Sequence, residues 1–103
     1  MAKSGKVYKI KIADTAADFI RKQPKKNQRQ IMNKISSLAE NPHSKGDAIK
    51  SKPEFFKIRS GNFRIAYTVK ERQVLVLVVR VGHRKDFYRY FERYTVSSYL
   101  LVL

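Results

Sequence analysis

The chain has 103 residues, which is enough for one hydrophobic core and too few for two domains. Its 23 Lys and Arg residues outnumber 8 Asp and Glu, and the formal charge of +15 favours a polyanionic partner such as RNA or DNA. The absence of cysteine excludes disulfides, thiolate catalysis and cysteine-ligated zinc, and the longest apolar run, Val74 to Val79, is too short to span a membrane. We therefore expect a cytoplasmic protein without a membrane partner.

The N-terminal half predicts one strand and a helical hairpin. Residues 7–12 alternate with period two, which is typical of a half-exposed strand. Asp14 is placed to cap a short helix that ends near Pro24, and a second helix is expected from Pro24 to Asn41. The second helix carries an apolar stripe made of Ile31, Ile35, Leu38 and Ala39. The outer side of the hairpin is expected to be a solvated basic face made of Lys25, Lys26, Arg29 and Lys34. The polar stretch 43–53 is predicted to be a loop.

Period-two alternation resumes at Phe55 and predicts the next strand. Phe56 and Ile58 point to one side of it, so Lys57 and Arg59 must share the opposite face. Basic residues two apart on an exposed strand are, in most proteins, ordinary solvated charge. The pair alone therefore does not indicate a site.

Two further strands should complete the sheet. A turn at residues 60–62 leads into strand 63–69, whose Phe63 and Tyr67 belong to the core by alternation. The run 74–81 is almost continuously apolar, which is typical of a central strand buried on both faces. The order of elements indicates the α+β class: an antiparallel sheet of about four strands, a helical hairpin on one face, and a short C-terminal helix that Asp86 is placed to cap.

Three runs of sequence resemble the RelE/ParE superfamily of toxins from type II toxin–antitoxin modules, in particular its RelE ribonuclease branch. They are Phe56-Lys57-Ile58-Arg59, Gly61-Asn62-Phe63-Arg64-Ile65-Ala66-Tyr67 and Val81-Gly82-His83-Arg84-Lys85-Asp86-Phe87-Tyr88. With the order of elements, the resemblance covers about residues 7–91 of a single domain spanning residues 1–103. The apolar tail at 92–103 lies outside it, and its role is open.

The resemblance implies an activity and a set of partners. RelE-like toxins enter the ribosomal A site and cut mRNA there without a metal or other cofactor, and contact with 16S rRNA is implied as well. The 2'-hydroxyl attacks the adjacent phosphate, leaving a cyclic phosphate or 3'-phosphate and a 5'-hydroxyl. A RelB-like antitoxin neutralises the toxin by wrapping it, and the complex is expected to bind its own operator DNA through the antitoxin.

The resemblance also assigns roles to basic residues. Such cleavage needs a base for the 2'-hydroxyl, cations for the phosphoryl oxygens and an acid for the leaving oxygen. Arg64 matches the arginine that grips the scissile phosphate, and a guanidinium suits that task. Lys57 is matched to nucleophile activation or charge stabilisation, Arg59 to charge alone because arginine keeps its proton, and Arg84 to the leaving group. The expected additional RNA-binding residues are Lys50, Lys52 and Lys85.

Three residues compete for the remaining proton transfer. Counting from Arg84 favours Tyr90, whereas members with a His-Arg-Lys-Asp-x-Tyr run favour Tyr88. On a helix that starts near Asp86, Tyr88 and Tyr90 would point in different directions, so only one can face the basic sheet. Tyr88 is preferred if it lies before the helix is established, in the loop directly after Arg84. His83 is a further alternative because imidazole exchanges protons near neutral pH, although strand alternation would place it on the face opposite Arg84.

Two rival functions remain open at this point. The ParE branch shares the fold and poisons DNA gyrase without nuclease chemistry, and a plain nucleic-acid-binding domain would hold phosphate without cutting it. The four cations Lys57, Arg59, Arg64 and Arg84 together favour the nuclease. No metal is expected, because the acidic residues of the second half fall on different elements. They are Glu54, Glu71, Asp86 and Glu92.

Overall fold

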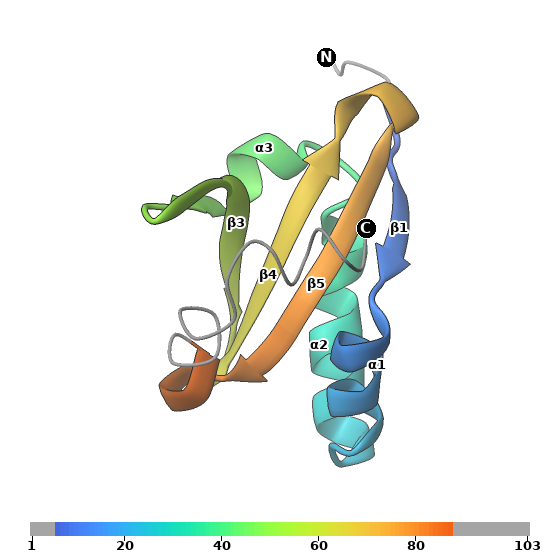
Figure 1. Cartoon of the computed structure of the whole chain (residues 1–103). Helices are drawn as coiled ribbons and strands as arrows, with labels where there is room; N and C mark the ends of the chain where they lie inside the picture. Colours follow the sequence, from blue (N-terminus) through green and yellow to red (C-terminus); the bar gives the residue numbers. More distant parts are fainter. Residues whose placement is uncertain (1–5, 88–103) are drawn as a thin grey trace.

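The computed structural model describes residues 6–87 and consists of one sheet backed by helices (Figure 1). The elements in chain order are β1 (Lys9–Ile12), α1 (Asp14–Arg21), α2 (Lys25–Ser37), α3 (Pro42–Lys45), β2 (Asp47–Ile49), β3 (Lys52–Ser60), β4 (Phe63–Lys70), the short 3-10 helix η1 (Glu71–Gln73) and β5 (Leu75–His83). Residues 84–87 are helical and follow β5 directly. The predicted α+β class is confirmed.

The sheet has five strands in the order β1-β5-β4-β3-β2, and it is mixed. Strands β2 to β5 pair antiparallel through short turns, but β1 runs parallel to β5, with Ile10 opposite Val76. The prediction of a purely antiparallel sheet was therefore wrong. Its physical reason is that β1 pairs with the last strand and not with its sequence neighbour, because the helices occupy the connection after β1.

Helices α1 and α2 lie on one face of the sheet, as predicted (Figure 1). The stripe residues Ile31, Ile35 and Leu38 are fully buried there against Ile65 and Tyr67 of β4. Burial of side chains of this size stabilises the fold by roughly 1.5–3 kcal/mol each. The other face of the sheet, which we call the open face, is not covered by α1 or α2 (Figure 1).

Several boundaries differ from those predicted. The expected loop at 43–53 contains most of α3, all of β2 and the first residues of β3, because Asp47 pairs with Lys57 and extends the sheet by a strand. Asp14 is the first residue of α1 and not its cap; Ala13 occupies the cap position. The terminal helical segment begins at residue 84, two residues before Asp86, the residue that was predicted to cap it.

Strand β5 contains a β-bulge that changes which side chains reach the open face. Tyr67 is opposite Val78, and the next β4 residue back, Ala66, is opposite Arg80, so Val79 is the extra residue. Val79 and Arg80 therefore both belong to the open face. Strict alternation along 74–81 would have placed Arg80 among the core residues under the helices.

Four side chains from distant parts of the chain meet at the end of the sheet near η1. Glu71 accepts hydrogen bonds from Lys6 Nζ at 2.6 Å and from the Tyr8 hydroxyl at 2.8 Å, and its other carboxylate oxygen lies 2.9 Å from His43 Nε2. These hydrogen bonds, of which that from His43 is the largest contribution and that from Lys6 the next, lower the pKa of Glu71 to about 2. The contacts tie the segment before β1 and the start of α3 to the β4–β5 turn.

Replacing this carboxylate should change how stability depends on pH. The pKa of Glu71 in the folded state, about 2, is below its ordinary value of 4.5, so the stabilisation is complete above about pH 4.5 and is lost as the pH falls toward 2. We expect Glu71→Gln to lower stability at pH 7 and to flatten the loss of stability across that acid range. Urea unfolding at pH 7, 4 and 3 measures both effects. The exposed Glu40, replaced in the same way, is the control, and an acid limb as steep in Glu71→Gln as in the wild type would contradict the prediction.

Candidate nucleic-acid interface

Cationic side chains form two adjacent rows across the open face. In the first row Arg59, Arg64 and Gly82 are opposite one another on β3, β4 and β5. In the second row, two residues further along, Lys57, Ala66 and Arg80 are opposite one another. The predicted sharing of one face by Lys57 and Arg59 is therefore seen, and the register brings Arg64 beside them.

A cavity of about 540 Å³, which we call the edge groove, opens at the side of β3 where β2 ends. The edge groove is lined by Lys34, Lys45, Asp47, Lys57, Ile58, Arg59 and Arg64. Its charged residues are five cations and one carboxylate. Cations gathered around a concave surface focus a positive potential, so the groove is suited to a phosphate group.

Arg64 is held in place by the turn that precedes β4. Its Nη1 donates hydrogen bonds to the carbonyl oxygens of Gly61, at 3.2 Å, and Phe63, at 3.1 Å. Gly61 has a φ of 60°, a left-handed conformation that glycine adopts without strain. One edge of the guanidinium is thereby fixed on backbone carbonyls. The half-buried side chain is preorganised to present its remaining donors to an anion.

Lys57 owes its position to a close approach at Gly46. A Cβ atom at Gly46 would lie 2.7 Å from the carbonyl oxygen of Lys57 and 2.5 Å from the hydroxyl oxygen of Tyr67. That hydroxyl donates a hydrogen bond to the Pro42 carbonyl at 2.7 Å, and burial raises the pKa of Tyr67 to about 12. The buried phenol thus anchors the chain before β2 against β3, at the point where the edge groove begins.

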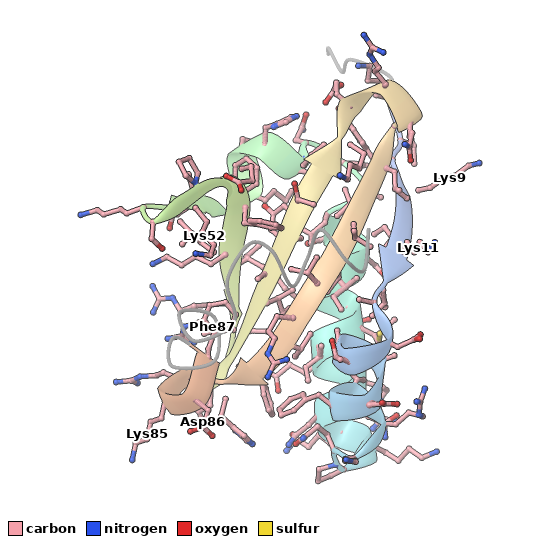
Figure 2. All side chains as sticks on the ribbon, in the orientation of Figure 1. Lys9, Lys11, Lys52, Lys85, Asp86 and Phe87 are labelled. Atoms are coloured by element: carbon pink, nitrogen blue, oxygen red, sulfur yellow. The ribbon has the colours of Figure 1, made fainter. Side chains whose placement is uncertain are left out.

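Arg84 lies beside the same end of the sheet. Its backbone N–H donates to the Asn62 carbonyl at 2.8 Å, which joins the segment after β5 to the β3–β4 turn. Lys50 and Lys52 belong to the β2–β3 hairpin, at the other end of β3. Figure 2 shows Lys52 and Lys85 on the same side of the molecule but near opposite ends of the sheet. Of the predicted RNA-binding lysines, Lys50 and Lys52 therefore lie at one end of the cationic rows and Lys85 at the other.

His83 is separated from the cationic rows. It is opposite Phe63 in the sheet, and its ring lies 5.1 Å from the ring of Phe63 and 5.4 Å from that of Phe19 in α1, centroid to centroid. Because Phe63 belongs to the core under the helices, His83 lies on the helix side of the sheet. This placement supports a packing role for the imidazole.

The two candidate tyrosines, Tyr88 and Tyr90, and the tail at 92–103 lie outside the described residues. The ground for preferring Tyr88 was wrong in one respect, since the helical segment starts at Arg84 and not near Asp86. The preceding aromatic residue, Phe87, is buried on the open face with Phe55, Ala66 and Val79 (Figure 2). Phe87 therefore packs over the open face of the sheet.

Sequence reasoning missed several residues of this interface. Arg80 was read as part of an apolar strand, although it is the only charge between Val74 and Val81. Lys34 was assigned to a solvated helix face and Lys45 to a loop, yet both line the edge groove. For Arg80 the lone charge was a usable signal. For the two lysines no local pattern exists, because their proximity to Lys57 depends on the tertiary fold.

The acidic and imidazole side chains are dispersed. Within residues 6–87, no three of the His, Asp and Glu side chains come together in a way that could hold a metal ion. A second cavity, of about 490 Å³, lies between β1 and β5 with Leu75, Leu77 and Val79 in its wall, and none of the predicted site residues lines it. No helix in the part of the chain that the structure describes is long and apolar enough to cross a membrane.

Fold and interface together define a small α+β protein with a preorganised cationic surface. The family model described as ParE toxin of type II toxin-antitoxin system, parDE, matches residues 10–88. A protein of Escherichia coli described as a RelE-like toxin is 30% identical over 80 residues, covering 76% of this chain and 84% of the relative. The chain belongs to the RelE/ParE superfamily of toxins of type II toxin–antitoxin systems.

Two further comparisons concern the RelE toxin of Escherichia coli. The mRNA interferase toxin RelE of strain K12 is 30% identical over 60 residues, which are 56% of this chain and 63% of the relative. The crystal structure of the intact Escherichia coli RelBE toxin–antitoxin complex contains a chain that is 27% identical, with a TM-score of 0.65 and coverage of 74% of this chain and 95% of the other. The resemblance noted from three sequence runs is confirmed.

Proposed function

We propose that this toxin is a metal-independent endoribonuclease that cleaves mRNA in the ribosomal A site and thereby inhibits translation. The observation that carries the proposal is the register that sets Arg64 between Arg59 and Gly82, with Lys57 in the adjacent row. Cleavage by a neighbouring 2'-hydroxyl needs concentrated positive charge and no bound metal. RelE of Escherichia coli, which carries the name mRNA interferase, supports the same activity.

Each cation has a separate task in this mechanism. Arg64, fixed by two backbone carbonyls, binds the non-bridging oxygens of the scissile phosphate. Lys57 stabilises the negative charge that develops as the 2'-oxygen attacks, and Arg59 adds charge from the same strand. Arg84, beside the β3–β4 turn, stabilises the departing 5'-oxygen. The 2'-hydroxyl gives its proton to a base, and the P–O bond to the 5'-oxygen breaks as the bond from the 2'-oxygen forms. The departing 5'-oxygen takes up a proton, so the products are a cyclic phosphate and a 5'-hydroxyl.

The ParE-like alternative is inhibition of DNA gyrase by binding. The family model that matches the chain carries the ParE name. An experiment is therefore needed to decide between the ParE and RelE branches. We favour the ribonuclease because gyrase binding does not require several cations held toward one phosphate. A third reading, a basic domain that binds nucleic acid without cutting it, is tested by the same experiment.

Primer extension on a defined mRNA, translated in a purified system, separates these functions. A ribonuclease produces new 5' ends within codons only when ribosomes are present. A gyrase inhibitor leaves the mRNA intact and blocks supercoiling of relaxed plasmid, whereas a simple binder leaves the mRNA intact and does not block supercoiling. Intact mRNA at toxin concentrations that arrest translation would refute the proposed activity.

The partners follow from the same proposal. The toxin works in the cytoplasm on ribosome-bound mRNA, where additional contact with 16S rRNA is expected. A RelB-like antitoxin neutralises it, in line with the RelBE complexes among its structural relatives, and the toxin–antitoxin pair binds operator DNA through the antitoxin. A segment with clustered carboxylates would complement the cationic rows. Co-expression of the RelB-like antitoxin with this toxin should therefore restore growth and yield a stable complex of the two proteins.

The tyrosine that moves a proton can be identified by removing single hydroxyl groups. Tyr88 fits the His-Arg-Lys-Asp-x-Tyr run, so we expect Tyr88→Phe to slow single-turnover cleavage by about tenfold or more, within the usual range for proton transfer. Tyr90→Phe is the matched control and should cleave at nearly the wild-type rate. The opposite ranking would assign the role to Tyr90. Two unaffected variants would exclude both hydroxyls as the proton-transfer group.

A further inference from the structure

The β-bulge in β5 determines where Arg80 lies. If the pairing continued regularly past Val78, Val79 would be opposite Ala66 and Arg80 opposite Ile65, which is fully buried in the core under the helices. Because of the bulge, Arg80 is opposite Ala66 on the open face and half-buried. Bulges commonly re-aim a side chain next to a functional site. Keeping a charge out of the core would explain the bulge on its own, so the surroundings of Arg80 decide what else it does.

Arg80 and Lys57 are on either side of Ala66 in one register row. They are two strand spacings apart, about 9.6 Å between Cα atoms, a distance that two long cationic side chains can close from both sides. The residue between them has only a methyl group, which is fully buried. Phe55, Val79 and Phe87 belong to the same buried cluster as that methyl group. The second row thus has a cation at each end of a buried apolar centre.

The distance between the two rows fits a nucleic-acid strand. Arg64 and Ala66 are two residues apart on β4, which corresponds to about 6.6 Å along the strand. This spacing is comparable with that of successive phosphates in an extended single strand whose backbone follows a cationic groove. If Arg64 holds one phosphate, the next phosphate along the backbone falls at the second row.

We infer that Arg80 forms a second phosphate-binding position, which holds the phosphate adjacent to the scissile one in single-stranded RNA, while Lys57 at the other end of the row acts on the scissile phosphate. Arg80 acts there as a substrate-binding residue, since it contacts a phosphate that does not react. The inference rests on the proposed function for its choice of RNA, but not on cleavage. Binding at two successive phosphates also fixes the direction in which the RNA crosses the sheet.

The test uses a short single-stranded RNA made resistant to cleavage by 2'-O-methyl groups. Replacing Arg80 with Gln should weaken its binding about tenfold, as expected for loss of a charge-assisted hydrogen bond. The slope of log affinity against log salt should fall by about 0.7, the value for one phosphate contact on a single strand. Arg80→Lys should recover most of the affinity. Arg72→Gln, an identical charge change in η1 at the far end of the sheet, is the matched control and should keep the wild-type slope.

A second set of RNAs locates the contact. In each one a single phosphate is replaced by an uncharged methylphosphonate, and the affinities of wild type, Arg80→Gln and Arg64→Gln are compared as double-mutant cycles. We expect Arg64 to couple to one phosphate and Arg80 to a direct neighbour of that phosphate. Coupling of Arg80 to a remote phosphate, or to none, would overturn the inference. So would equal affinities and slopes for Arg80→Gln and Arg72→Gln.

Cleavage kinetics separate this inference from the proposed function. On programmed ribosomes, Arg80→Gln should raise KM and leave kcat nearly unchanged, because the contact is the same in the ground and transition states. A wild-type protein that fails to cut mRNA refutes the ribonuclease, while the binding cycles still report on Arg80. A large drop in kcat with unchanged KM would show instead that Arg80 acts on the reacting phosphate.

Discussion

Arg64→Ala should reduce single-turnover mRNA cleavage about 10²- to 10³-fold, the usual cost of removing one preorganised charge contact from a transition state. The side chain donates to the Gly61 and Phe63 carbonyls. The hydrogen bond to Gly61 is exposed, so water can replace the guanidinium at that carbonyl, and the fold should be retained. Growth arrest in cells and cleavage on programmed ribosomes are the two measurements, and circular dichroism confirms folding.

Matched variants make the Arg64 result specific. Arg72→Ala removes the same charge from η1, at the far end of the sheet, and should remain toxic. Lys57→Ala should be nearly as severe as Arg64→Ala, whereas Arg59→Lys should be mild because only charge is required of that position. An Arg64→Ala protein that arrests growth as strongly as wild type would remove this residue from the site.

The largest effect on stability is expected at Tyr67. Its ring is fully buried, stacks on Phe56 with centroids 5.3 Å apart, and carries the hydroxyl that is bonded to Pro42. Tyr67→Ala should cost about 3–5 kcal/mol, as for other large aromatic truncations, against a total stability of about 5–15 kcal/mol for a typical domain. We expect much of this variant to be unfolded at 37 °C.

Tyr67→Phe isolates the hydroxyl from the ring. It leaves the Pro42 carbonyl without its donor in a buried position, which should cost about 1–3 kcal/mol. Urea unfolding followed by circular dichroism gives both values, and an unchanged denaturant slope would show that the unfolded state is the same. A midpoint for Tyr67→Ala equal to that of wild type would contradict the assigned packing.

The features that could be predicted from sequence are those fixed by local patterns. Alternation from Phe55 to Val69 identified β3 and β4 and the faces of Lys57 and Arg64, because side chains in a strand alternate whatever the partner strand is. The glycine turn that joins these strands set their register. The stripe Ile31, Ile35 and Leu38 likewise identified the buried side of α2.

The features that could not be predicted depend on which segments pair. The parallel partnership of β1 and β5 requires knowing that the last strand enters the centre of the sheet. The bulge at Val79 is visible only once Ala66 is paired with Arg80. Lys45 reaches the edge groove because β2 pairs with β3, and a strand of three residues leaves almost no trace in hydrophobic periodicity.

Strand β5 lies between β1 and β4, and this position has a consequence for synthesis of the chain. Lys9 to Ile12 of β1 pair with Leu75 to Val78 of β5, so β1 cannot pair until β5 has left the ribosome. Contacts between such distant segments form late, because a long loop must close before they contribute. A nascent chain that ends before residue 75 also leaves one side of β4 unpaired. Arg80 therefore joins Lys57 in the second row only after β5 has been synthesised and has paired with β4.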